Sequence, residues 1–390
     1  MTDKVFTARI LSSIDEVTAA QWNGLLPARG TRDYHPFTDW QFLNALEESG
    51  CASQNTGWTP RHIWIEDGNG KPLGAAPLYA KSHSQGEYVF DHGWADALHR
   101  AGPDYYPKLQ CSIPFTPAAG PRLLTSDTHV RRALISAIAQ LCQEEGYSGV
   151  HLTFLQEPDR AQLSEYGFLP RQDRQFHFIN YGYKNFDDVL AAMSSRKRKN
   201  VRKERQRAQD GMTIKRITGT DLRPEHWDAF YRFYQNTSMR KWGKPYLNRK
   251  FFQLIHQRFA DNVLLVLAYQ NGENAPMAGA LNFIGGDTLY GRNWGADYTI
   301  PFLHFELCYY QAIDAALELG LGRVEAGAQG EHKLARGYQP ATTYSAHYLA
   351  HDGLRSAVAN YLDRERRAVD HEVEALARYT PFKKGNSNVD

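Results

Sequence analysis

The chain has 390 residues, 42% of them hydrophobic and 23% charged, and a formal net charge of +2 at pH 7. These values indicate a soluble globular protein long enough for two ordinary domains. No stretch approaches the roughly 20 apolar residues of a membrane span, and the N-terminus lacks the pattern of a secretory signal. The four scattered cysteines predict reduced thiols in the cytoplasm and argue against a cysteine zinc site.

Hydrophobic periodicity and turn residues predict helices and strands along the first half. Helices are expected at 14–26 and 38–49, hairpin strands at 61–65 and 73–79, a helix at 130–144 and a strand at 150–155. Residues 82–120 lack strong periodicity and are rich in Gly, Pro, Tyr and His, so they read as a long insert. Loops of this length are often functional.

The second half shows a similar order of elements. Helices are expected at 187–193, 195–209, 224–237, 246–259, 303–319 and 354–378, and strands at 263–269, 276–284, 288–294, 323–326 and 341–350. Each half therefore reads as helices, an antiparallel meander, and then helix, strand, helical turn and strand. That order predicts a mixed sheet covered by helices, an α/β (α+β) layered fold.

Three landmarks recur in the same order, which predicts that one domain plan occurs twice. Gly167 to Pro170 is matched 170 residues on by Gly337 to Pro340, and Gly146 is matched by Gly320. Hairpin signals at 70–76 and 274–280 supply the third landmark. The predicted domains are residues 1–178 with the insert at 82–120, residues 179–352 with a basic helix at 195–209, and a C-terminal helix and tail at 353–390.

A strongly basic run lies at residues 196–207. It holds eight Lys or Arg residues against Glu204, or 8 − 1 = +7, which leaves the rest of the chain at 2 − 7 = −5. Such a cluster suits phosphate groups of a tRNA or a nucleotide, although a solvated helix face is the alternative. The proposed phosphate-binding residues are Arg196, Lys197, Lys199, Arg202 and Lys203.

A second polar segment follows the strand predicted at 323–326. Acyl transfer to an amine needs a group that accepts a proton, for which Glu325, Glu331 and His332 are candidates. Lys333 and Arg336 are candidates for binding a phosphate or a carboxylate. The alternative is that the acidic and basic residues are surface groups and the histidine caps a turn. The equivalent stretch of the first half is much poorer in titratable groups, which favours function in the second half.

Other clusters predict binding rather than catalysis. Lys241 and Trp242 suit stacking with a nucleobase or sugar, or else anchor a turn. The insert and its surroundings predict an acceptor pocket lined by Asp91, His92, Tyr105, Tyr106 and Arg122, or else the Trp and Tyr residues of the insert belong to the core. No metal site is expected, because His304 and Glu306 are two apart on a helix. The sequence lacks the nucleophile and phosphate-loop motifs of hydrolases and kinases.

The element order resembles the GNAT acyltransferase fold, and two copies in one chain resemble Fem-type aminoacyltransferases. The motifs are similar to the FemAB-like family of peptidoglycan biosynthesis/recognition proteins and predicted N-acyltransferases. The matching strings cover residues 81–97, 105–110, 114–124, 194–205, 240–247, 285–295, 302–313 and 325–340. The resemblance implies transfer of an amino acid from aminoacyl-tRNA to a cell-wall-precursor amine, whereas ordinary GNAT enzymes use acyl-CoA.

The donor is judged from the stretch that begins at Arg292 and includes Trp294, both of which are candidate substrate-binding residues. It matches only the first part of the glycine-rich motif by which GNAT enzymes hold the CoA pyrophosphate. We therefore expect an aminoacyl-tRNA donor, no tightly bound cofactor, and direct attack of the amine on the acyl carbonyl. Acyl-CoA is the alternative donor, and a non-catalytic module that binds RNA or a cell-wall precursor is the third reading. The oligomeric state is left open.

Overall fold

The computed structural model describes residues 6–241, 243–327 and 330–383, with the backbone alone for Glu157, Pro158 and Lys241. The chain divides into two compact units that alternate along the sequence. Unit 1 comprises residues 1–31, 37–173 and 342–371, and unit 2 comprises 32–36, 174–341 and 372–390. The domain boundaries predicted from the sequence, at 178 and 352, stay a prediction.

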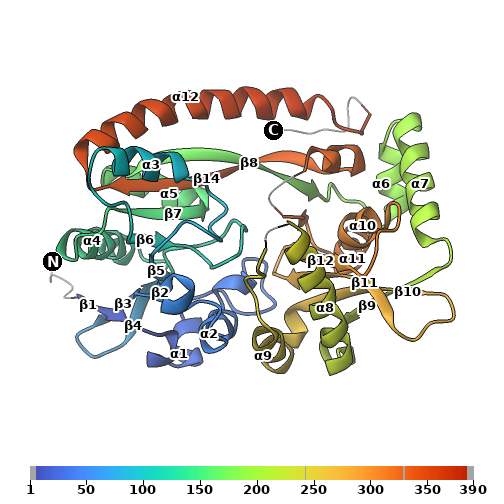
Figure 1. Cartoon of the computed structure of the whole chain (residues 1–390), viewed down its shortest axis with the longest axis horizontal. Coiled ribbons are helices and arrows are strands. Elements are labelled where there is room, and N and C mark those ends of the chain that lie inside the picture. Colours follow the sequence, from blue (N-terminus) through green and yellow to red (C-terminus); the bar gives the residue numbers. More distant parts are fainter. Residues whose placement is uncertain (1–5, 242, 328–329, 384–390) are drawn as a thin grey trace. The chain divides into compact units, whose positions relative to one another are not determined.

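Unit 1 contains two groups of strands and several helices (Figure 1). Its helices are α1 (Ala19–Asn23), α2 (Trp40–Glu48), α3 (His92–Arg100), α4 (Thr128–Glu144), α5 (Glu157–Glu165) and the first part of α12 (Asp352–Ala377). Its strands are β1 (Phe6–Leu11), β2 (Trp58–Pro60), β3 (His62–Asp67), β4 (Pro72–Ala76), β5 (Leu78–Lys81), β6 (Lys108–Cys111) and β7 (Gly149–Leu155). Two further strands, β8 (Leu169–Ile179) and β14 (Gln339–Leu349), run from one unit into the other.

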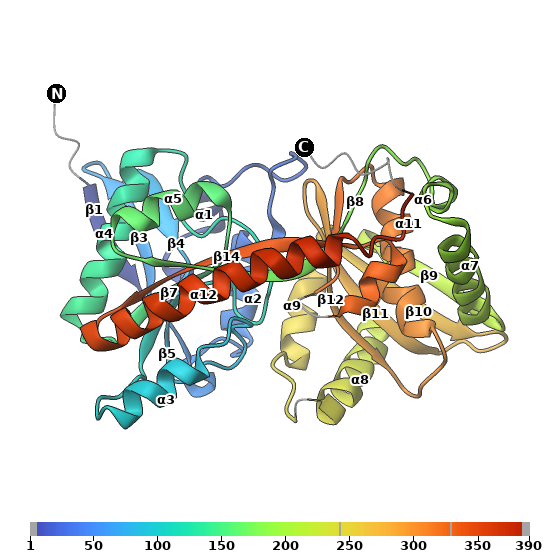
Figure 2. The same ribbon diagram turned by 90° about the horizontal axis from the view of Figure 1, so that it is seen from above.

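The strands of unit 1 form a small sheet β1-β3-β4 and a larger run β2-β5-β6-β7-β14, in which only β6 and β7 are parallel. The core lies between these strands and α4, whose Leu134 and Ile138 pack with Val150 and Leu152 of β7. Helix α12 covers another face, where Leu354, Val358 and Leu362 meet Leu349 of β14 and Trp94 of α3 (Figure 2).

Unit 2 repeats the pattern with longer strands. Its helices are α6 (Phe186–Ala192), α7 (Ser195–Gln209), α8 (Pro224–Lys241), α9 (Arg249–Phe259), α10 (Leu303–Phe305) and α11 (Gln311–Glu318). Its strands are β9 (Met212–Thr218), β10 (Val263–Gln270), β11 (Pro276–Ile284), β12 (Thr288–Ala296) and β13 (Arg323–Glu325). They run β8-β13-β12-β11-β10-β9, with only β12 and β13 parallel. The core packs Ile313 and Leu307 against Val266, Leu289 and Val324.

The predicted repeat has a structural counterpart. Helix α4 is followed by Gly146 at φ 69°, and helix α11 is followed by Gly320 at φ 68°, a left-handed conformation that glycine adopts without strain. The residue after each glycine donates a backbone hydrogen bond back into its helix, from Tyr147 to Cys142 and from Leu321 to Ala316. Each helix then leads to the parallel strand of its unit.

Each half of the chain ends in a strand, β8 or β14. That strand pairs with a strand contributed by the other half. Strand β8 follows β7 in the chain but pairs with β13 in unit 2, where Phe178 lies opposite Val324. Strand β14 follows β13 but pairs with β7 in unit 1, where Tyr348 lies opposite Val150. The two halves therefore exchange their final strands.

The sequence predictions need corrections in the insert. Residues 82–120 are not structureless, because they contain α3 and β6. Strand β6 is short and is held by β5 on one side and β7 on the other, and α3 is held by the contacts of Trp94 and Leu98 with α12 and β14. Both elements depend on tertiary pairing that local periodicity does not carry. Strands β1 and β9 and helix α5 were also missed.

Candidate functional site

The candidate site of unit 2 begins where β12 and β13 stop pairing. Thr288–Tyr290 lie beside Arg323–Glu325, after which β13 ends and β12 continues to Ala296. Arg292 is the extra residue of a bulge in β12, since Asn282 and Leu281 on β11 lie opposite Gly291 and Asn293. A bulge re-aims the strand next to a site. Beyond this point a group of side chains gathers, the strand-end cluster: Trp294, His304, Phe305, Tyr309, His332, Lys333 and Arg336.

His332 is the most accessible titratable group of this cluster. It lies in the short 3-10 helix Glu331–Arg336 and is exposed. Its Nε2 is 2.8 Å from the hydroxyl of Tyr309, and its ring contacts those of Phe305 and His304. One imidazole nitrogen is thus engaged by a phenol, which orients the ring for proton transfer.

Lys333 is buried in the same turn, with 1% of its surface exposed. Its Nζ donates to the carbonyl of Gly327 at 2.8 Å and lies 6.0 Å from the ring centre of Tyr309. Among the described residues no carboxylate lies within 4.0 Å of this Nζ. Burial lowers the pKa of Lys333 to about 8. The ammonium is therefore a buried cation near a site edge, available to an anionic group.

Arg336 connects the cluster to the basic helix α7. Its guanidinium lies 3.4 Å over the ring of Phe305 and donates to the carbonyl of His332 at 2.6 Å. It also forms an ion pair of 3.0 Å with Glu204 of α7, whose second oxygen accepts a hydrogen bond from Tyr310. Arg336 is thus mainly a structural link, and Glu204 is the residue of α7 that sequence reasoning missed.

A widened helical turn makes a second connection to α7. Residues Glu306–Tyr310 form a π-helical turn between α10 and α11. Glu306 is fully buried there and pairs with Arg205 of α7 at 3.0 Å, while Gln209 donates to it at 2.9 Å. Arg205 also reaches Asp314 at 2.6 Å. Glu306 and Arg205 are therefore anchoring residues, and the ring of His304 contacts that of Trp294 at a tilt of 60°, with the ring centres 5.1 Å apart.

The remaining cations of α7 face outward. Arg196, Lys199, Arg202 and Lys203 are exposed and Lys197 is half-buried. Arg202 lies 4.0 Å from the exposed carboxylate of Asp187, and within the described part of the chain the other four form no ion pair. This surface, the α7 basic face, keeps its charge available for a ligand.

The two candidate glutamates lie in different surroundings. Glu325 is buried at the end of β13, opposite His177 of β8 and beside Tyr290 of β12. Glu331 is exposed and lies 3.8 Å from Arg174. The structure thus places His332 and Lys333 within the cluster and turns Glu331 toward solvent and an arginine.

The residues considered for CoA binding lie in a strand. Arg292 and Trp294 belong to β12, and the strand continues through Gly295 to Ala296. A Cβ at Gly295 would lie 2.1 Å from the carbonyl oxygen of Phe233 in α8. Close packing of α8 on β12 therefore explains this glycine without a phosphate ligand. Trp242 lies outside the described residues, as does the side chain of Lys241, the last residue of α8.

Unit 1 holds Asp91 and Tyr105 in a buried polar network. The Nζ of Lys108 contacts Glu87 at 2.7 Å and also Asp91, and the Tyr105 hydroxyl donates to Asp91 at 2.7 Å. Burial alone would lower the pKa of Lys108, but the two carboxylates raise it above its ordinary value. Tyr105 further contacts Nε2 of His151 at 3.2 Å. These side chains are buried, and Oε1 of Glu87 and Oδ1 of Asp91 have no hydrogen-bond partner among the described residues.

The other members of this network were also missed from sequence. Lys81 lies 3.9 Å from Glu87 and 3.6 Å over the ring of Trp58, and His151 lies 2.7 Å from His347. Burial lowers the pKa of Lys81 to about 7 and raises that of Glu87 to about 7. The sequence offered one signal for them. Strands β5 and β6 are short and mostly apolar, and each has a lysine at one end.

The three remaining acceptor candidates differ in accessibility. His92 is exposed at the start of α3, and Tyr106 is half-buried with its hydroxyl 2.8 Å from Ser84. Arg122 is fully buried and donates to the carbonyls of Thr153 at 2.9 Å and Ala118 at 2.8 Å. A small molecule can reach the first two in this structure, whereas Arg122 supports the backbone.

Known structures share this fold. FemX aligns over 88% of this chain and 98% of its own, with a TM-score of 0.54 and 14% identity. The C-terminal domain of a putative lysylphosphatidylglycerol synthetase from Agrobacterium fabrum covers 89% and 96%, with a TM-score of 0.53 and 9% identity. A protein of unknown function from Bacteroides thetaiotaomicron covers 88% and 99%, with a TM-score of 0.51 and 12% identity. No curated protein matches the sequence significantly.

The mixed α/β fold of this chain is therefore the fold of FemX. The profile of the FemAB-like family, described as peptidoglycan biosynthesis/recognition, matches residues 13–384, and the chain belongs to that family. The mixed α/β class and the family expected from the sequence are both confirmed. Within the described residues, every helix is too short or too polar to cross a membrane.

Proposed function

We propose that this chain is an N-acyltransferase that moves an aminoacyl group from aminoacyl-tRNA to an amine of a cell-wall precursor, with the reaction at the strand-end cluster of unit 2. One observation carries the proposal: the helix with the α7 basic face is fixed directly to that cluster. The Glu204–Arg336 and Arg205–Glu306 ion pairs make both connections. A bound phosphate backbone on α7 would therefore be held at a set place relative to His332.

The choice of donor follows from charge and packing. A tRNA offers many phosphates to a surface on which only Arg202 has a described ion-pair partner, the exposed carboxylate of Asp187 at 4.0 Å. The aromatic rings of Trp294 and His304, 5.1 Å apart, suit stacking with the terminal base of the donor. The strand conformation of Arg292 and the packing of Gly295 on α8 disfavour the phosphate loop of a CoA enzyme at this position.

The chemistry requires one proton acceptor and one positive charge. The acceptor amine attacks the ester carbonyl, a C–N bond forms, and the C–O bond to the tRNA ribose breaks. His332, oriented by Tyr309, takes the amine proton and returns it to the leaving ribose oxygen. The Lys333 ammonium stabilises the negative charge that develops on the carbonyl oxygen.

The test is a single-turnover transfer assay of the full chain with an amine acceptor and two donors. Labelled aminoacyl-tRNA is expected to give an amide product that acyl-CoA does not. Product from acyl-CoA alone would establish the alternative donor. Absence of product with both donors, together with retained RNA or precursor in mass analysis of the native protein, would support the non-catalytic reading and overturn the proposal.

A further inference from the structure

A charged cavity lies in unit 1, and none of the charged residues that line it has been used above. It has a volume of about 530 Å³ and opens between helices α5 and α12 over strand β8. Its charged lining consists of Arg160, Arg366, Arg367, Asp363 and Asp370. The balance is 3 − 2 = +1, and we call this cavity the arginine groove.

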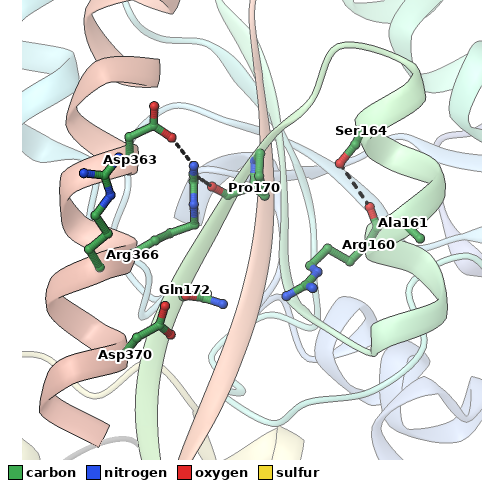
Figure 3. Close-up of a pocket in the computed structure, with 9 residues that line it drawn as sticks. Arg160, Ala161, Ser164, Pro170, Gln172, Asp363, Arg366 and Asp370 are labelled. Carbon is green, nitrogen blue, oxygen red and sulfur yellow. Dashed lines mark hydrogen bonds and ion pairs between the residues drawn. The ribbon is translucent and has the colours of Figure 1, made fainter. Parts of the chain in front are cut away.

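Two of the guanidinium groups are held in place before any ligand binds. Arg366 reaches from α12 to the carbonyl of Pro170 at 2.6 Å and pairs with Asp363 (Figure 3). The Arg160 guanidinium lies 4.3 Å from the ring centre of Tyr344. A guanidinium carries five N–H donors, so Arg366 keeps donors beyond these two contacts. Prepositioned arginines lower the ordering cost of binding an anion.

The rest of the lining is polar but not uniformly cationic. Gln172 of β8 lies between the two helices in Figure 3, and its Oε1 is buried without a hydrogen-bond partner among the described residues. Arg367 and Asp370 are exposed on α12 and form no ion pair within the described chain. An acceptor oxygen and a carboxylate beside arginines suit a ligand that is anionic at one end and carries hydroxyl or amino groups at the other.

We infer that the arginine groove binds a phosphate-bearing molecule, its phosphate on Arg160, Arg366 and Arg367 and its hydroxyl or amino groups on Gln172 and Asp370. Arginine forks match phosphate oxygens with paired hydrogen bonds. The cavity is of the size of small-molecule sites and larger than a lone inorganic ion needs. A soluble phosphate ester and a lipid phosphate headgroup share this chemistry.

The test is calorimetric titration of the full chain with inorganic pyrophosphate at low ionic strength. All proteins in this titration, the parent included, carry Lys199→Gln and Lys203→Gln, so that the α7 basic face contributes less to pyrophosphate binding. Arg160→Gln and Arg367→Gln are each expected to weaken binding about tenfold. Asp370→Asn should tighten it, because a carboxylate that repels the anion is removed. Arg366 is left intact because it also holds α12 to β8.

The matched control is Arg364→Gln. Arg364 is an exposed arginine of α12 outside the groove, and among the described residues it hydrogen-bonds only to Asn360 of its own helix. Its affinity should equal that of the parent. Binding of the protein to phosphatidylcholine vesicles with or without phosphatidic acid distinguishes the two sources of phosphate. Retention of the protein that depends on both Arg160 and phosphatidic acid indicates a lipid headgroup. Pyrophosphate binding without vesicle binding indicates a soluble ligand. No saturable binding of either, or equal affinities for Arg160→Gln, Arg367→Gln and Arg364→Gln, would overturn the inference.

Discussion

Both units bury lysines, but they satisfy them differently. In unit 1, Lys108 contacts both Glu87 and Asp91, and all three side chains are at most 2% exposed. In unit 2, Lys333 has a backbone carbonyl and an aromatic ring as neighbours, and no described carboxylate pairs with it. Lys108 is therefore neutralised by two carboxylates, whereas Lys333 has none beside it. Lys81 of unit 1, 3.9 Å from Glu87 and with a pKa lowered to about 7, lies between these two cases.

The contrast separates a stabilising network from a reactive one. Burying a charge is costly unless it is paired, so an unpaired buried lysine persists at a cost in stability. Perturbed lysines of that kind gather at functional sites. The accessible His332 beside Lys333 supports this interpretation for unit 2, whereas unit 1 turns its charges inward. Four changes test the contrast.

Replacing His332 should have the largest effect on transfer. His332→Ala is expected to lower the single-turnover rate by about 10²–10⁴-fold, the usual contribution of a general base. Because the side chain is exposed, the unfolding midpoint should stay near that of the parent. His129→Ala, at an exposed histidine of α4, is the matched control. A rate equal to that of the control would remove His332 from the mechanism.

Replacing Lys108 should have the largest effect on stability. Lys108→Met leaves Asp91 buried without its cation and Glu87 with only the more distant Lys81 at 3.9 Å, which is expected to cost about 3–5 kcal/mol in the free energy of unfolding. Urea denaturation measures the loss, and Lys71→Met, at an exposed lysine of the β3–β4 turn, should change little. If Lys108→Met were as stable as that control, the network of unit 1 would not be the stabilising one.

Replacing Lys333 should raise the free energy of unfolding at pH 7, whereas replacing Lys108 should lower it. Its folded pKa of about 8 is below the ordinary value of 10.5, so the unfolded chain binds this proton more tightly. The unfolding free energy of the parent should therefore rise between pH 8 and 10.5, and Lys333→Met should lose that increment. At pH 7 the variant should be more stable by roughly 1–3 kcal/mol while transfer falls. Destabilisation at pH 7 would contradict an unpaired buried cation.

The smallest effect concerns the α7 basic face. Lys199→Gln with Lys203→Gln should weaken tRNA binding and reduce the slope of log K against log salt by about 0.7–0.9 for each lost phosphate contact. The pair Lys71→Gln with Arg364→Gln removes two exposed charges elsewhere and should leave the slope unchanged. Equal slopes for both pairs would indicate a solvated helix face.

Sequence periodicity located most of the helices and strands but did not show which strands pair with one another. Helix α7 was predicted with its observed bounds, because eight cations and few apolar residues still leave Val201 and Ala208 on one buried stripe. Strand β6 was missed because only its neighbours β5 and β7 fix its four residues. The repeat at Gly146 and Gly320 was visible in sequence, whereas the exchange of β8 and β14 was not, since nothing local specifies a strand's partner.

The candidate site was predictable where residues lie close in sequence. His332 and Lys333 both follow β13, and their closeness in the sequence indicated that they belong to one site. Glu204 and Glu306 reach the cluster from other elements, and on a helix each looked like an ordinary charged residue. Asp91 and Tyr105 were predicted to line an acceptor pocket, and the structure places both in the buried network of Lys108, so their role in binding stays a prediction. Burial and partner identity are properties of the tertiary structure.

The exchanged strands restrict how the chain can be divided in the laboratory. A fragment of residues 1–178 would contain β7, whose seven residues are all buried, without the segment of β14 that pairs with it. Its open apolar edge would invite intermolecular association. The complementary fragment would lack β8 beside β13. Each fragment carries the strand that the other needs, so co-expression of the two should rescue solubility where separate expression fails.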